Sequence, residues 1–594
     1  MDSMEMAGRA VAALLDGGVR HIVVAPGSRS APLAYALAAA EAEGTVRLHV
    51  RIDERDAGFT ALGLALVSGC PVAVVTTSGT AVGNLMPSVM EANHSAVPLI
   101  VVSADRPEEL RGTGANQTTR QAGLFGTAVR YDVDVPAGAD PAGSVATGIA
   151  AALGTGTSRL AGVRGPVQLN LAFRDPLTPV LEPGSAAKPS RQDGTEVSRG
   201  RTGQDELAAL DFPDRREGVE QPNVSGDPGR AVESRDGSDR VALRTPGSEH
   251  RTVVVAGAGA GAGAELFASL LRLPLFADPT SNARHGANAV GPYRLLLEHL
   301  GQDIERVVLF GRPTLSRQVA ALLARTDVET AFYEPEPVAW YESGRRRERP
   351  IATRDELAEF AGTGPAGWLA SWQEAADRSE AALDSVLARE PVVTGLQVAR
   401  SLWADTTRRN ARLVVGSSNP IRDLDLAARP AERSWAGVFA NRGIAGIDGT
   451  IATATGIALA EPERETRLLL GDLTLLHDVG GLFLGSGEAS PNLQIIVLND
   501  AGGGIFSLLE HGLLGESDQY RDSVERLFGT PHTVDISALA QAYGVRYRLA
   551  GTAVELEGAL AERIRGRSII EVRTERADLR NLHQRIKDAI RTAV

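Results

Sequence analysis

Short apolar runs alternate with helical patterns from residue 7 to about residue 173 of the chain. The apolar runs cover residues 21–26, 47–53, 70–79, 97–107 and 165–173, and the helical patterns cover residues 7–18 and 33–44. Most of the runs are apolar at consecutive positions, which is typical of strands buried on both faces of a sheet. We therefore expect a parallel sheet with helices packed on both sides.

The same alternation begins again at residue 251 and a third time near residue 394. Before the second unit, residues 184–250 are rich in Gly, Ser, Asp, Arg and Pro, with one short helix-like patch. Such a composition buries too little apolar surface to form a core, so we predict a disordered or loosely packed linker. The predicted fold is α/β with three doubly wound parallel-sheet domains. Their predicted bounds are 1–183, 251–375 and 385–594.

Residues 57–90 contain no Asp, Glu, Lys or Arg, so a membrane span is one interpretation of this stretch. A spanning helix needs about 20 mostly apolar residues in succession. Here Gly69 and Pro71 interrupt the run, and Thr, Ser and Asn side chains crowd its second half. A buried helix, a turn and a buried strand describe the stretch better, and we expect no stable insertion into a membrane.

The composition is typical of a globular protein, with 43% hydrophobic and 23% charged residues. The formal net charge of −13 argues against broad binding to nucleic acid or to an acidic membrane, which requires an excess of cationic side chains. Cys70 is the only cysteine, which excludes an internal disulfide and a cysteine-based metal site and suits a reducing compartment. The segment at Met1 lacks the basic and apolar regions of a signal peptide, so we expect a cytoplasmic protein.

Almost all of the positive charge is arginine, because the chain has only two lysines, Lys188 and Lys587. Schiff-base catalysis and P-loop phosphate binding each require a placed lysine. Lys188 falls in the predicted linker, and Lys587 falls in a charged pattern near the end of the chain. Neither chemistry is therefore expected.

Alternating glycines follow an apolar run at the start of the second unit, from Gly257 through Gly259 and Gly261 to Gly263. A helical pattern comes next and Asp278 lies about 20 residues on, which partly matches a dinucleotide-binding fingerprint. A Gly-Ala repeat also satisfies many other patterns. A tight strand-to-helix turn without a ligand is the favoured interpretation, and nucleotide binding is the alternative.

Two acidic residues follow successive apolar runs in the third unit. Asp472 comes directly after the run that ends at Gly471, and Asp500 follows the next run. Ligands of parallel sheets lie beyond the carboxyl ends of the strands. Two carboxylates and the carbonyl of Gly502 would supply the oxygen ligands that Mg²⁺ prefers, and the glycines would let the backbone approach a diphosphate. In the alternative, Asp472 caps a helix and residues 499–504 form a simple turn.

This order, GD followed by ND and glycines, resembles the diphosphate and magnesium motif of thiamine diphosphate-dependent enzymes, in which Asn is more frequent than the Asp500 of this chain. Longer segments narrow the resemblance to the 2-succinyl-5-enolpyruvyl-6-hydroxy-3-cyclohexene-1-carboxylate (SEPHCHC) synthase family of menaquinone biosynthesis. These segments are APGSRSAPL, IDERDAGFTALGLA, TSGTAVGNLMPSVMEA, SADRPEELRGTGANQT, GPVQLNLAFRDPL, NRGIAGIDGTIATATG and NDAGGGIFSLL. The resemblance covers the first and third units well, the middle unit weakly and the linker not at all.

The resemblance implies a pyrimidine-binding domain over residues 1–183, a central Rossmann-like domain over 251–375 and a diphosphate-binding domain over 385–594. It also implies that Glu54 exchanges a proton with the aminopyrimidine ring of thiamine diphosphate and so helps to form the ylid. On the residues alone, Glu54 belongs to a run of four charged residues for which a solvated surface is the favoured interpretation, and the motif match reverses that preference.

Further residues of the implied cofactor site come from the third unit. Ile447 matches the apolar wedge that keeps the cofactor bent, and Phe506 matches a residue near the thiazolium and the substrate; each would otherwise be an ordinary core residue. The implied catalytic residues are Glu54, Ile447 and Phe506. The implied cofactor-binding residues are Glu54, Ile447, Gly471, Asp472, Leu473, Thr474, Asp500, Gly502 and Ile505, of which Asp472, Asp500 and Gly502 would hold Mg²⁺ or Mn²⁺.

Two dicarboxylate substrates, 2-oxoglutarate and isochorismate, are implied as well. Planar guanidinium groups suit the bidentate recognition of carboxylates. The residues implied for isochorismate are Ser28, Arg29, Arg106, Asn116, Gln117 and Arg317. The residues implied for the oxoglutarate-derived arm are Ser418, Arg422 and Arg442. In so arginine-rich a chain, a surface ion pair is the alternative for any one of these arginines.

The implied reaction decarboxylates 2-oxoglutarate and adds the succinyl-semialdehyde carbanion to isochorismate, with the cofactor as the electron sink. Because Glu54 belongs to the first unit and Asp472 to the third, and because subunits of this superfamily share their sites, a homodimer or a dimer of dimers is implied. Two alternatives stay open. One is another thiamine diphosphate enzyme, such as a 2-oxo acid decarboxylase or an acetolactate synthase relative, and the other is a non-catalytic nucleotide-binding protein.

Overall fold

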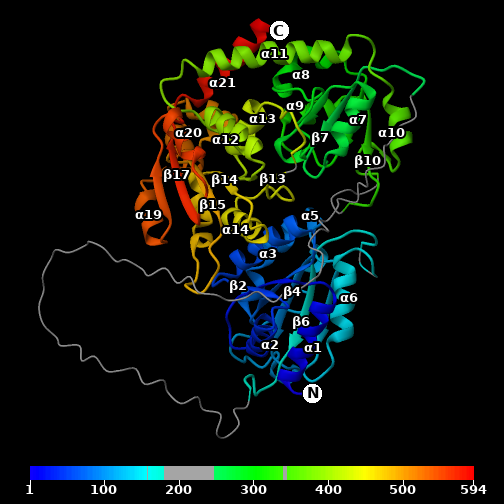
Figure 1. The fold of residues 1–594 in the computed structure, drawn as a ribbon, viewed down its shortest axis with the longest axis vertical. Helices are drawn as coiled ribbons and strands as arrows, with labels where there is room; N and C mark the ends of the chain where they lie inside the picture. Colours follow the sequence, from blue (N-terminus) through cyan, green and yellow to red (C-terminus); the bar gives the residue numbers. More distant parts are fainter. Residues whose placement is uncertain (157, 159, 180–245, 339–343, 436) are drawn as a thin grey trace, which may run out of the picture. The chain divides into compact units, whose positions relative to one another are not determined.

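Three parallel sheets follow one another along the chain, with helices between their strands (Figure 1). The computed structural model describes residues 1–594 with the exception of 157, 159, 180–245, 339–343 and 436. The predicted α/β fold with three parallel sheets is confirmed. The predicted linker lies outside the described residues except for its last five, where His250 donates a backbone hydrogen bond to the carbonyl of Thr363.

The first sheet has six parallel strands in the order β2-β1-β3-β4-β6-β5. The strands are β1 (His21–Val24), β2 (Arg47–Val50), β3 (Val72–Thr76), β4 (Leu99–Asp105), β5 (Tyr131–Val135) and β6 (Val167–Ala172). The helices are α1 (Ser3–Asp16), α2 (Ala31–Ala42), α3 (Glu54–Ser68), α4 (Thr80–Gly83), α5 (Met86–His94) and α6 (Ala142–Ala152), with 3₁₀ turns η1 (Glu108–Leu110) and η2 (Gly126–Ala128). Every residue of β3, β4 and β6 is buried, as expected for central strands covered on both faces. The sequence patterns did not predict β5, because this edge strand alternates Val with Asp.

The second sheet has five parallel strands in the order β11-β10-β9-β7-β8. The strands are β7 (Thr252–Ala256), β8 (Leu275–Ala277), β9 (Arg306–Phe310), β10 (Glu329–Tyr333) and β11 (Arg349–Ile351). The helices are α7 (Gly263–Leu271), α8 (Tyr293–Leu300), α9 (Arg317–Ala324), α10 (Arg354–Ala361) and α11 (Trp368–Leu387), with 3₁₀ turns η3 (Pro279–Ser281) and η4 (Gly301–Asp303). The long helix α11 packs Trp368 and Trp372 into one hydrophobic cluster with Ile586 near the end of the chain.

The third sheet again has six parallel strands, in the order β13-β12-β14-β15-β17-β16. The strands are β12 (Arg412–Val415), β13 (Val438–Phe439), β14 (Thr466–Gly471), β15 (Leu493–Asn499), β16 (Arg546–Leu549) and β17 (Arg567–Arg573). The helices before β15 are α12 (Gly395–Arg409), α13 (Asn419–Ala427), α14 (Thr450–Ala460) and α15 (Asp472–His477), followed by η5 (Val479–Leu482). The later helices are α16 (Ile505–Leu508), α17 (Glu510–Gly515), α18 (Arg521–Val524), the π-helical turn η6 (Glu525–Gly529), α19 (Ile536–Ala542), α20 (Ala553–Ala561) and α21 (Leu579–Ala593).

The charge-free stretch 57–90 folds as most of α3, then β3, α4 and the start of α5. Helix α3 packs closely against α14, because a Cβ atom on Gly63 would lie 2.1 Å from the carbonyl oxygen of Thr453, and one on Gly456 would lie 2.1 Å from that of Thr60. The absence of charge from residues 57–68 of α3 therefore reflects burial against a second helix. No helix in the described part of the chain is long and apolar enough to cross a membrane.

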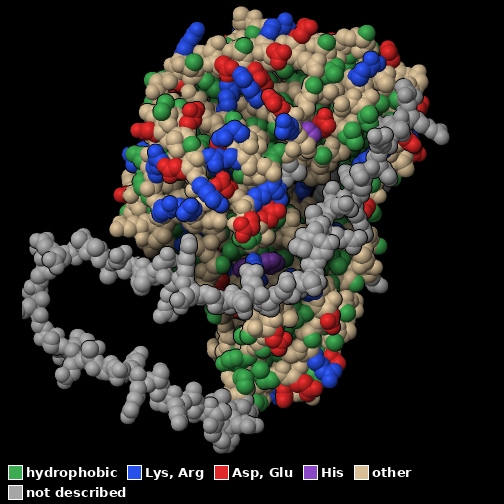
Figure 2. Space-filling model, in the orientation of Figure 1, with side chains coloured by type: hydrophobic (Ala, Val, Ile, Leu, Met, Phe, Trp, Pro, Cys, Tyr) green, Lys and Arg blue, Asp and Glu red, His purple; other side chains and the backbone are tan. Residues whose placement is uncertain are grey.

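Basic and acidic side chains are interspersed on the face of the molecule shown in Figure 2. Ion pairs among the described residues include Arg9 with Asp140 and Arg174 with Glu109, whose side chains are about half exposed. The absence of broad nucleic-acid binding, expected from the net charge of −13, stays a prediction.

Candidate active site

The carboxyl ends of β14 and β15 bring Asp472 and Asp500 to the same edge of the third sheet. The two strands pair in parallel with Gly471 opposite Leu498, and the two aspartates follow directly. Both aspartates line one cavity of about 480 Å³. Small-molecule sites commonly have volumes of about 300–1,000 Å³. The two carboxylates on which the sequence interpretation depends therefore lie at one site.

Asp472 is nearly fully buried and held by three hydrogen bonds. Its Oδ1 accepts from the backbone N–H of Leu473 at 2.6 Å, and its Oδ2 accepts from the backbone N–H of Gly502 at 2.9 Å. His532 Nε2 lies 3.1 Å from the same Oδ2. Burial raises the pKa of Asp472, and these donors oppose the rise. The N–H of Gly502 thereby ties the glycine loop to the end of β14.

The surroundings of Asp500 raise the pKa of its carboxyl group. Burial, followed by the negative charge of Asp472, raises the pKa of Asp500 to about 7. Its buried Oδ1 has no hydrogen-bond partner among the described residues. A bound divalent cation would compensate both the repulsion between the two carboxylates and the missing partner of this oxygen. The residues therefore fit Mg²⁺ or Mn²⁺.

The cation would take only part of its ligands from side chains. Among the described residues, no cluster of three or more His, Cys, Asp and Glu is arranged to hold a metal ion. Asp472 and Asp500 would thus supply two of the ligands of the cation. Backbone oxygens such as that of Gly502, and oxygens of a bound ligand, would complete its coordination shell. Mg²⁺ in particular often binds through one or two carboxylates together with substrate phosphates.

The cavity is lined by all of the predicted cofactor residues of the third unit. Those that line it are Ile447, Gly471, Asp472, Leu473, Thr474, Asp500, Gly502, Ile505 and Phe506, together with the predicted substrate residue Ser418. A Cβ atom on Gly504 would lie 2.1 Å from Asp500 Oδ2 and would displace that carboxylate, and one on Gly502 would lie 2.4 Å from the carbonyl oxygen of Gly529. The glycine-rich loop is therefore shaped around the acidic pair.

The structure adds two residues that the sequence patterns missed. Asp423 of α13 lines the same cavity, and burial raises the pKa of Asp423 to about 7. His532 contacts Asp472 from a loop 60 positions further on. An aspartate in a helix and a lone histidine in a loop carry no distinctive spacing, so only the folded chain shows that they belong to the site.

Glu54 lies in the first turn of α3, and Asn84 Nδ2 donates a 3.0 Å hydrogen bond to its Oε2. The side chain is half-buried. Its neighbours take structural roles, since Asp53 caps α3 and Asp56 is buried. Glu54 is not among the residues that line the cavity around Asp472, all of which come from residues 390–582.

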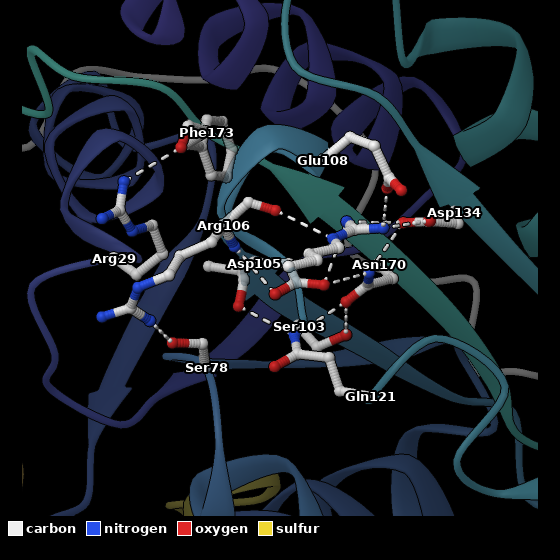
Figure 3. A network of polar contacts seen from close by, with 12 residues as sticks. Arg29, Ser78, Ser103, Asp105, Arg106, Glu108, Gln121, Asp134, Asn170 and Phe173 are labelled. Atoms are coloured by element: carbon white, nitrogen blue, oxygen red, sulfur yellow. Dashed lines mark hydrogen bonds and ion pairs between the residues drawn. The ribbon is translucent and has the colours of Figure 1, made fainter. Parts of the chain in front are cut away.

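Two of the predicted isochorismate residues of the first unit, Arg29 and Arg106, lie close together beyond the carboxyl ends of β1 and β4 (Figure 3). Arg106 Nη1 donates to Ser78 Oγ at 2.7 Å and to the carbonyl of Gln117 at 2.6 Å. Arg29 donates to the carbonyl of Phe173 at 3.0 Å. Burial, then the charge of Arg29, lowers the pKa of Arg106. Two close guanidinium groups form a cationic site of the kind that suits a carboxylate ligand.

Two other members of this predicted set, Ser28 and Asn116, are exposed beside these residues in sequence. Their exposure leaves both side chains accessible from solvent. Arg317, by contrast, begins α9 in the second unit and forms an exposed ion pair with Glu510, with Nη1 2.7 Å from Oε1. Arg317 therefore belongs to a helix of the second unit, whereas the group around Arg106 belongs to the first unit.

A second group of arginines surrounds Arg422. Burial lowers the pKa of Arg422, and the positive charges of Arg442, Arg294 and Arg317 lower it further. Its Nη1 donates to the carbonyl of Ser418 at 2.6 Å. Arg294 was not predicted, because nothing in its helical segment distinguishes it from a surface arginine. Neighbouring like charges of this kind are relieved by an anionic ligand, and dicarboxylates are anionic.

Glu91 of α5 holds the loop that carries Arg442 and Ile447. Its Oε1 accepts from the backbone N–H of Gly443 at 2.6 Å, and its Oε2 accepts from that of Ile444 at 2.7 Å. The Glu91 side chain is 3% exposed, so these hydrogen bonds replace its lost hydration. Glu91 is the last residue but one of a segment that carries the resemblance, but the sequence assigned it no role.

Backbone packing explains the first glycine of the repeat, Gly257, and positive φ angles of 81° and 71° favour glycine at Gly259 and Gly261. A Cβ atom on Gly257 would lie 2.2 Å from the carbonyl carbon of Arg312 and 2.3 Å from the nitrogen of Pro313. The backbones of Ala258 and Arg312 exchange hydrogen bonds across the same turn. Asp278 caps a 3₁₀ turn and accepts from Thr280. The arrangement matches a tight strand-to-helix turn, which was the favoured interpretation.

Comparison with known proteins places the chain in a family. Residues 4–124 match the model of the thiamine pyrophosphate enzyme N-terminal TPP binding domain, and residues 427–572 match that of the C-terminal TPP binding domain. The SEPHCHC synthase of Paenarthrobacter aurescens is 57% identical over 589 residues, covering 98% of this chain and 96% of the relative. That of Arthrobacter sp. (strain FB24) is 56% identical and covers 99% and 92%. The chain belongs to the SEPHCHC synthase family.

The SEPHCHC synthases are thiamine diphosphate-dependent enzymes of menaquinone biosynthesis, so the family and the activity expected from the sequence motifs are confirmed. The crystal structure of benzoylformate decarboxylase from Polynucleobacter necessarius aligns with a TM-score of 0.62 at 16% identity, over 97% of this chain and 99% of that chain. At this identity the likeness concerns the fold alone. It supports the succession of three parallel sheets.

Proposed function

We propose that this SEPHCHC synthase decarboxylates 2-oxoglutarate and joins the remaining four-carbon unit to isochorismate, with thiamine diphosphate and Mg²⁺ or Mn²⁺ bound at the edge of the third sheet. The observation that carries the proposal is the cavity that Asp472, Asp500 and Gly502 line together. When bound, thiamine diphosphate supplies the carbon nucleophile and the electron sink for the decarboxylation.

In this proposal the third unit, residues 385–594, is the diphosphate-binding domain. Asp472, Asp500 and the carbonyl of Gly502 hold the divalent cation, which in turn binds the diphosphate. Ile447, Ile505 and Phe506 are apolar or aromatic and line the same cavity, so they exclude water and orient the ligand by packing. Gly471, Leu473 and Thr474 supply backbone and side-chain contacts at the start of α15.

Residues 1–183 form the pyrimidine-binding domain in this scheme, and residues 251–375 form a central domain without a nucleotide. Glu54 holds and returns a proton through its carboxylate at the aminopyrimidine ring. Its hydrogen bond from Asn84 leaves one carboxylate oxygen for this contact. Proton transfer by a positioned carboxyl group commonly contributes about 10²–10⁴-fold to a rate.

The two arginine groups divide the substrates between them. Ser418, Arg422 and Arg442 bind the carboxylate of the 2-oxoglutarate-derived arm. Ser418 lines the cavity around Asp472, and Arg422 donates to the Ser418 carbonyl. Arg442 lines a second cavity, and its charge acts on Arg422. Isochorismate is bound by the group around Arg106, whose members are Ser28, Arg29, Arg106, Asn116 and Gln117. Arg317 joins this binding only if its ion pair with Glu510 opens.

A homodimer, or a dimer of dimers, completes the site. Within one chain Glu54 is absent from the residues that line the cavity around Asp472, and a second subunit would supply it. We place the enzyme in the cytoplasm, where its exposed cysteine, Cys70, stays reduced. Neither nucleic acid nor stable membrane insertion has a part in this function.

The decisive experiment incubates the purified protein with thiamine diphosphate, Mg²⁺ and 2-oxoglutarate, with and without isochorismate. We expect the six-membered-ring adduct only when both substrates are present. Rapid release of CO₂ without isochorismate, and no adduct with it, would instead support a 2-oxo acid decarboxylase. Calorimetric titration with thiamine diphosphate and Mg²⁺, compared with NAD and FAD, distinguishes an enzyme from a nucleotide-binding protein.

A further inference from the structure

Asn170 of β6 is the centre of a polar network inside the first sheet, which reaches Arg106 through Asp105 (Figure 3). It is fully buried and stands opposite Ser103 of β4 on one side and Asp134 of β5 on the other. It belongs to the segment GPVQLNLAFRDPL, which carries the family resemblance but contributes no predicted site residue.

The side-chain amide of Asn170 makes four hydrogen bonds. Its Oδ1 accepts from Ser103 Oγ at 2.9 Å and from Gln121 Nε2 at 2.8 Å. Its Nδ2 donates to Asp105 Oδ2 at 2.9 Å and to Asp134 Oδ1 at 2.7 Å. Two donors and two acceptors surround the amide, so its full hydrogen-bonding capacity is used. Neither aspartate nor leucine at this position could reproduce that pattern.

One branch of the network holds the backbone of Arg106 on both sides. Asp105 Oδ1 accepts from the N–H of Arg106 at 2.7 Å, while Asp105 Oδ2 binds Asn170 and lies 3.0 Å from Arg111 Nη2. Arg111 Nε donates to the carbonyl of Arg106 at 3.0 Å, and Arg111 also pairs with Asp134. Asn170 thus joins the two aspartates that fix Arg111 and Arg106.

The other branch holds the partners of the Arg106 guanidinium. Gln121 is fully buried, and its Oε1 accepts from the N–H of Gly79 at 3.0 Å. The preceding residue, Ser78, accepts from Arg106 and donates through Oγ to the carbonyl of Gln117 at 2.9 Å. Gln117 has φ of +56° and is packed over Gly79, so its position depends on this loop. The two branches therefore end on the same residue, one on the backbone of Arg106 and the other on its guanidinium.

We propose that Asn170 is a positioning residue for isochorismate: it sets the main chain of Arg106 through Asp105 and Arg111, and the Ser78 and Gln117 partners of Arg106 through Gln121. The inference rests on the proposed binding of isochorismate by the group around Arg106. Asn170 itself does not touch the substrate. It acts on the recognition of isochorismate and leaves the recognition of 2-oxoglutarate to the third sheet.

The test replaces Asn170 by leucine, which has a similar volume and no hydrogen-bonding group. KM for isochorismate is measured at saturating 2-oxoglutarate, and KM for 2-oxoglutarate at saturating isochorismate, with thiamine diphosphate and Mg²⁺ present. A displacement of about 1 Å can cost about 10²-fold in an enzyme, so we expect a rise of about 10- to 100-fold in KM for isochorismate. KM for 2-oxoglutarate should change by less than about threefold, because its carboxylate is bound elsewhere.

Asn288 provides the matched control, because it is a buried asparagine of the second unit whose Nδ2 donates to the carbonyls of Ala268 and Leu273. Asn288→Leu should lower the melting temperature and leave the ratio of the two KM values unchanged. Should Asn170→Leu fail to fold, Arg111→Gln tests the same branch from a side chain that is 19% exposed. An equal rise in both KM values, or no rise in either, would overturn the inference. If the wild-type enzyme forms no adduct from isochorismate, the proposed function fails first and the inference falls with it.

Discussion

Asp56 of α3 and Asp478 after α15 share one guanidinium group: Arg55 Nη2 lies 3.9 Å from Asp56 Oδ1 and 3.7 Å from Asp478 Oδ1. Both carboxylates are buried. Burial, followed by the charge of Asp53, raises the pKa of Asp56 to about 6. Burial, followed by the charge of Asp56, raises the pKa of Asp478 well above its ordinary range. The folded protein therefore retains a proton here that the unfolded chain releases.

This pair predicts a loss of stability as pH rises through the acidic range. Between pH of about 4 and about 6 the folded state binds more protons than the unfolded state, so the free energy of unfolding falls with pH, by an amount on the order of 2 kcal/mol. Asp56→Asn removes this titration and should flatten the profile in that window. The exposed Asp16, changed to Asn, controls for net charge. Urea denaturation at several pH values measures the free energy of unfolding. Parallel plots of this free energy against pH for Asp56→Asn and wild type would contradict the prediction.

Glu54→Gln should leave the fold intact and cut kcat by about 10²–10⁴-fold, because the amide keeps the volume and the contact with Asn84 but cannot exchange a proton. Single-turnover kinetics and thermal unfolding of the same preparation provide the measurement. Glu43→Gln, at an exposed position after α2, is the control. Normal turnover of Glu54→Gln would remove Glu54 from the proposed proton transfer.

Arg422→Ala should mainly raise KM for 2-oxoglutarate, because the substrate carboxylate loses a charge-assisted hydrogen bond of about 1.5–3 kcal/mol, equivalent to about 10- to 100-fold. Arg317→Ala is the matched comparison and should have a smaller effect, since Arg317 is exposed and paired with Glu510. Steady-state kinetics with each substrate varied in turn separates the two. An unchanged KM for Arg422→Ala would show that the carboxylate is bound elsewhere.

Asp500→Asn should retain cofactor binding, because an amide oxygen can replace the carboxylate oxygen as a ligand of Mg²⁺. Asp500→Ala removes that ligand and should weaken Mg²⁺-dependent binding of thiamine diphosphate by at least about tenfold, which corresponds to about 1.4 kcal/mol. Isothermal titration calorimetry measures both without reference to turnover. Equal affinities for Asp500→Ala and wild type would exclude Asp500 as a metal ligand.

Much of the third sheet could be predicted from its sequence. The runs that end at Gly471 and Asn499 are apolar at consecutive positions, and the parallel rule then places Asp472 and Asp500 at one edge.

Edge strand β5 of the first sheet escaped prediction because its alternating aspartates are typical of a turn or a solvated strand. In the structure, one of those aspartates, Asp134, is a partner of the buried Asn170.

The contacts that join distant segments could not be predicted in this way. Glu91 binds the backbone N–H of Gly443 across 352 positions, and His532 reaches Asp472 across 60. Neither pair has a spacing rule, because the distance between such residues is set by how separate units pack.

The sequence by itself determined the three parallel sheets, the acidic pair at the end of β14 and β15 and, through its long motifs, the family. The local hydrophobic pattern is sufficient for the sheets and for the acidic pair, since these depend on burial along each strand. Only the tertiary structure decided which distant groups meet: Asn170 with Asp105 and Gln121, Arg294 with the like charge of Arg422, and the backbone of residues 312–313 with Gly257. Those choices depend on three-dimensional packing and on the loss of water around buried polar groups, which a linear pattern does not record.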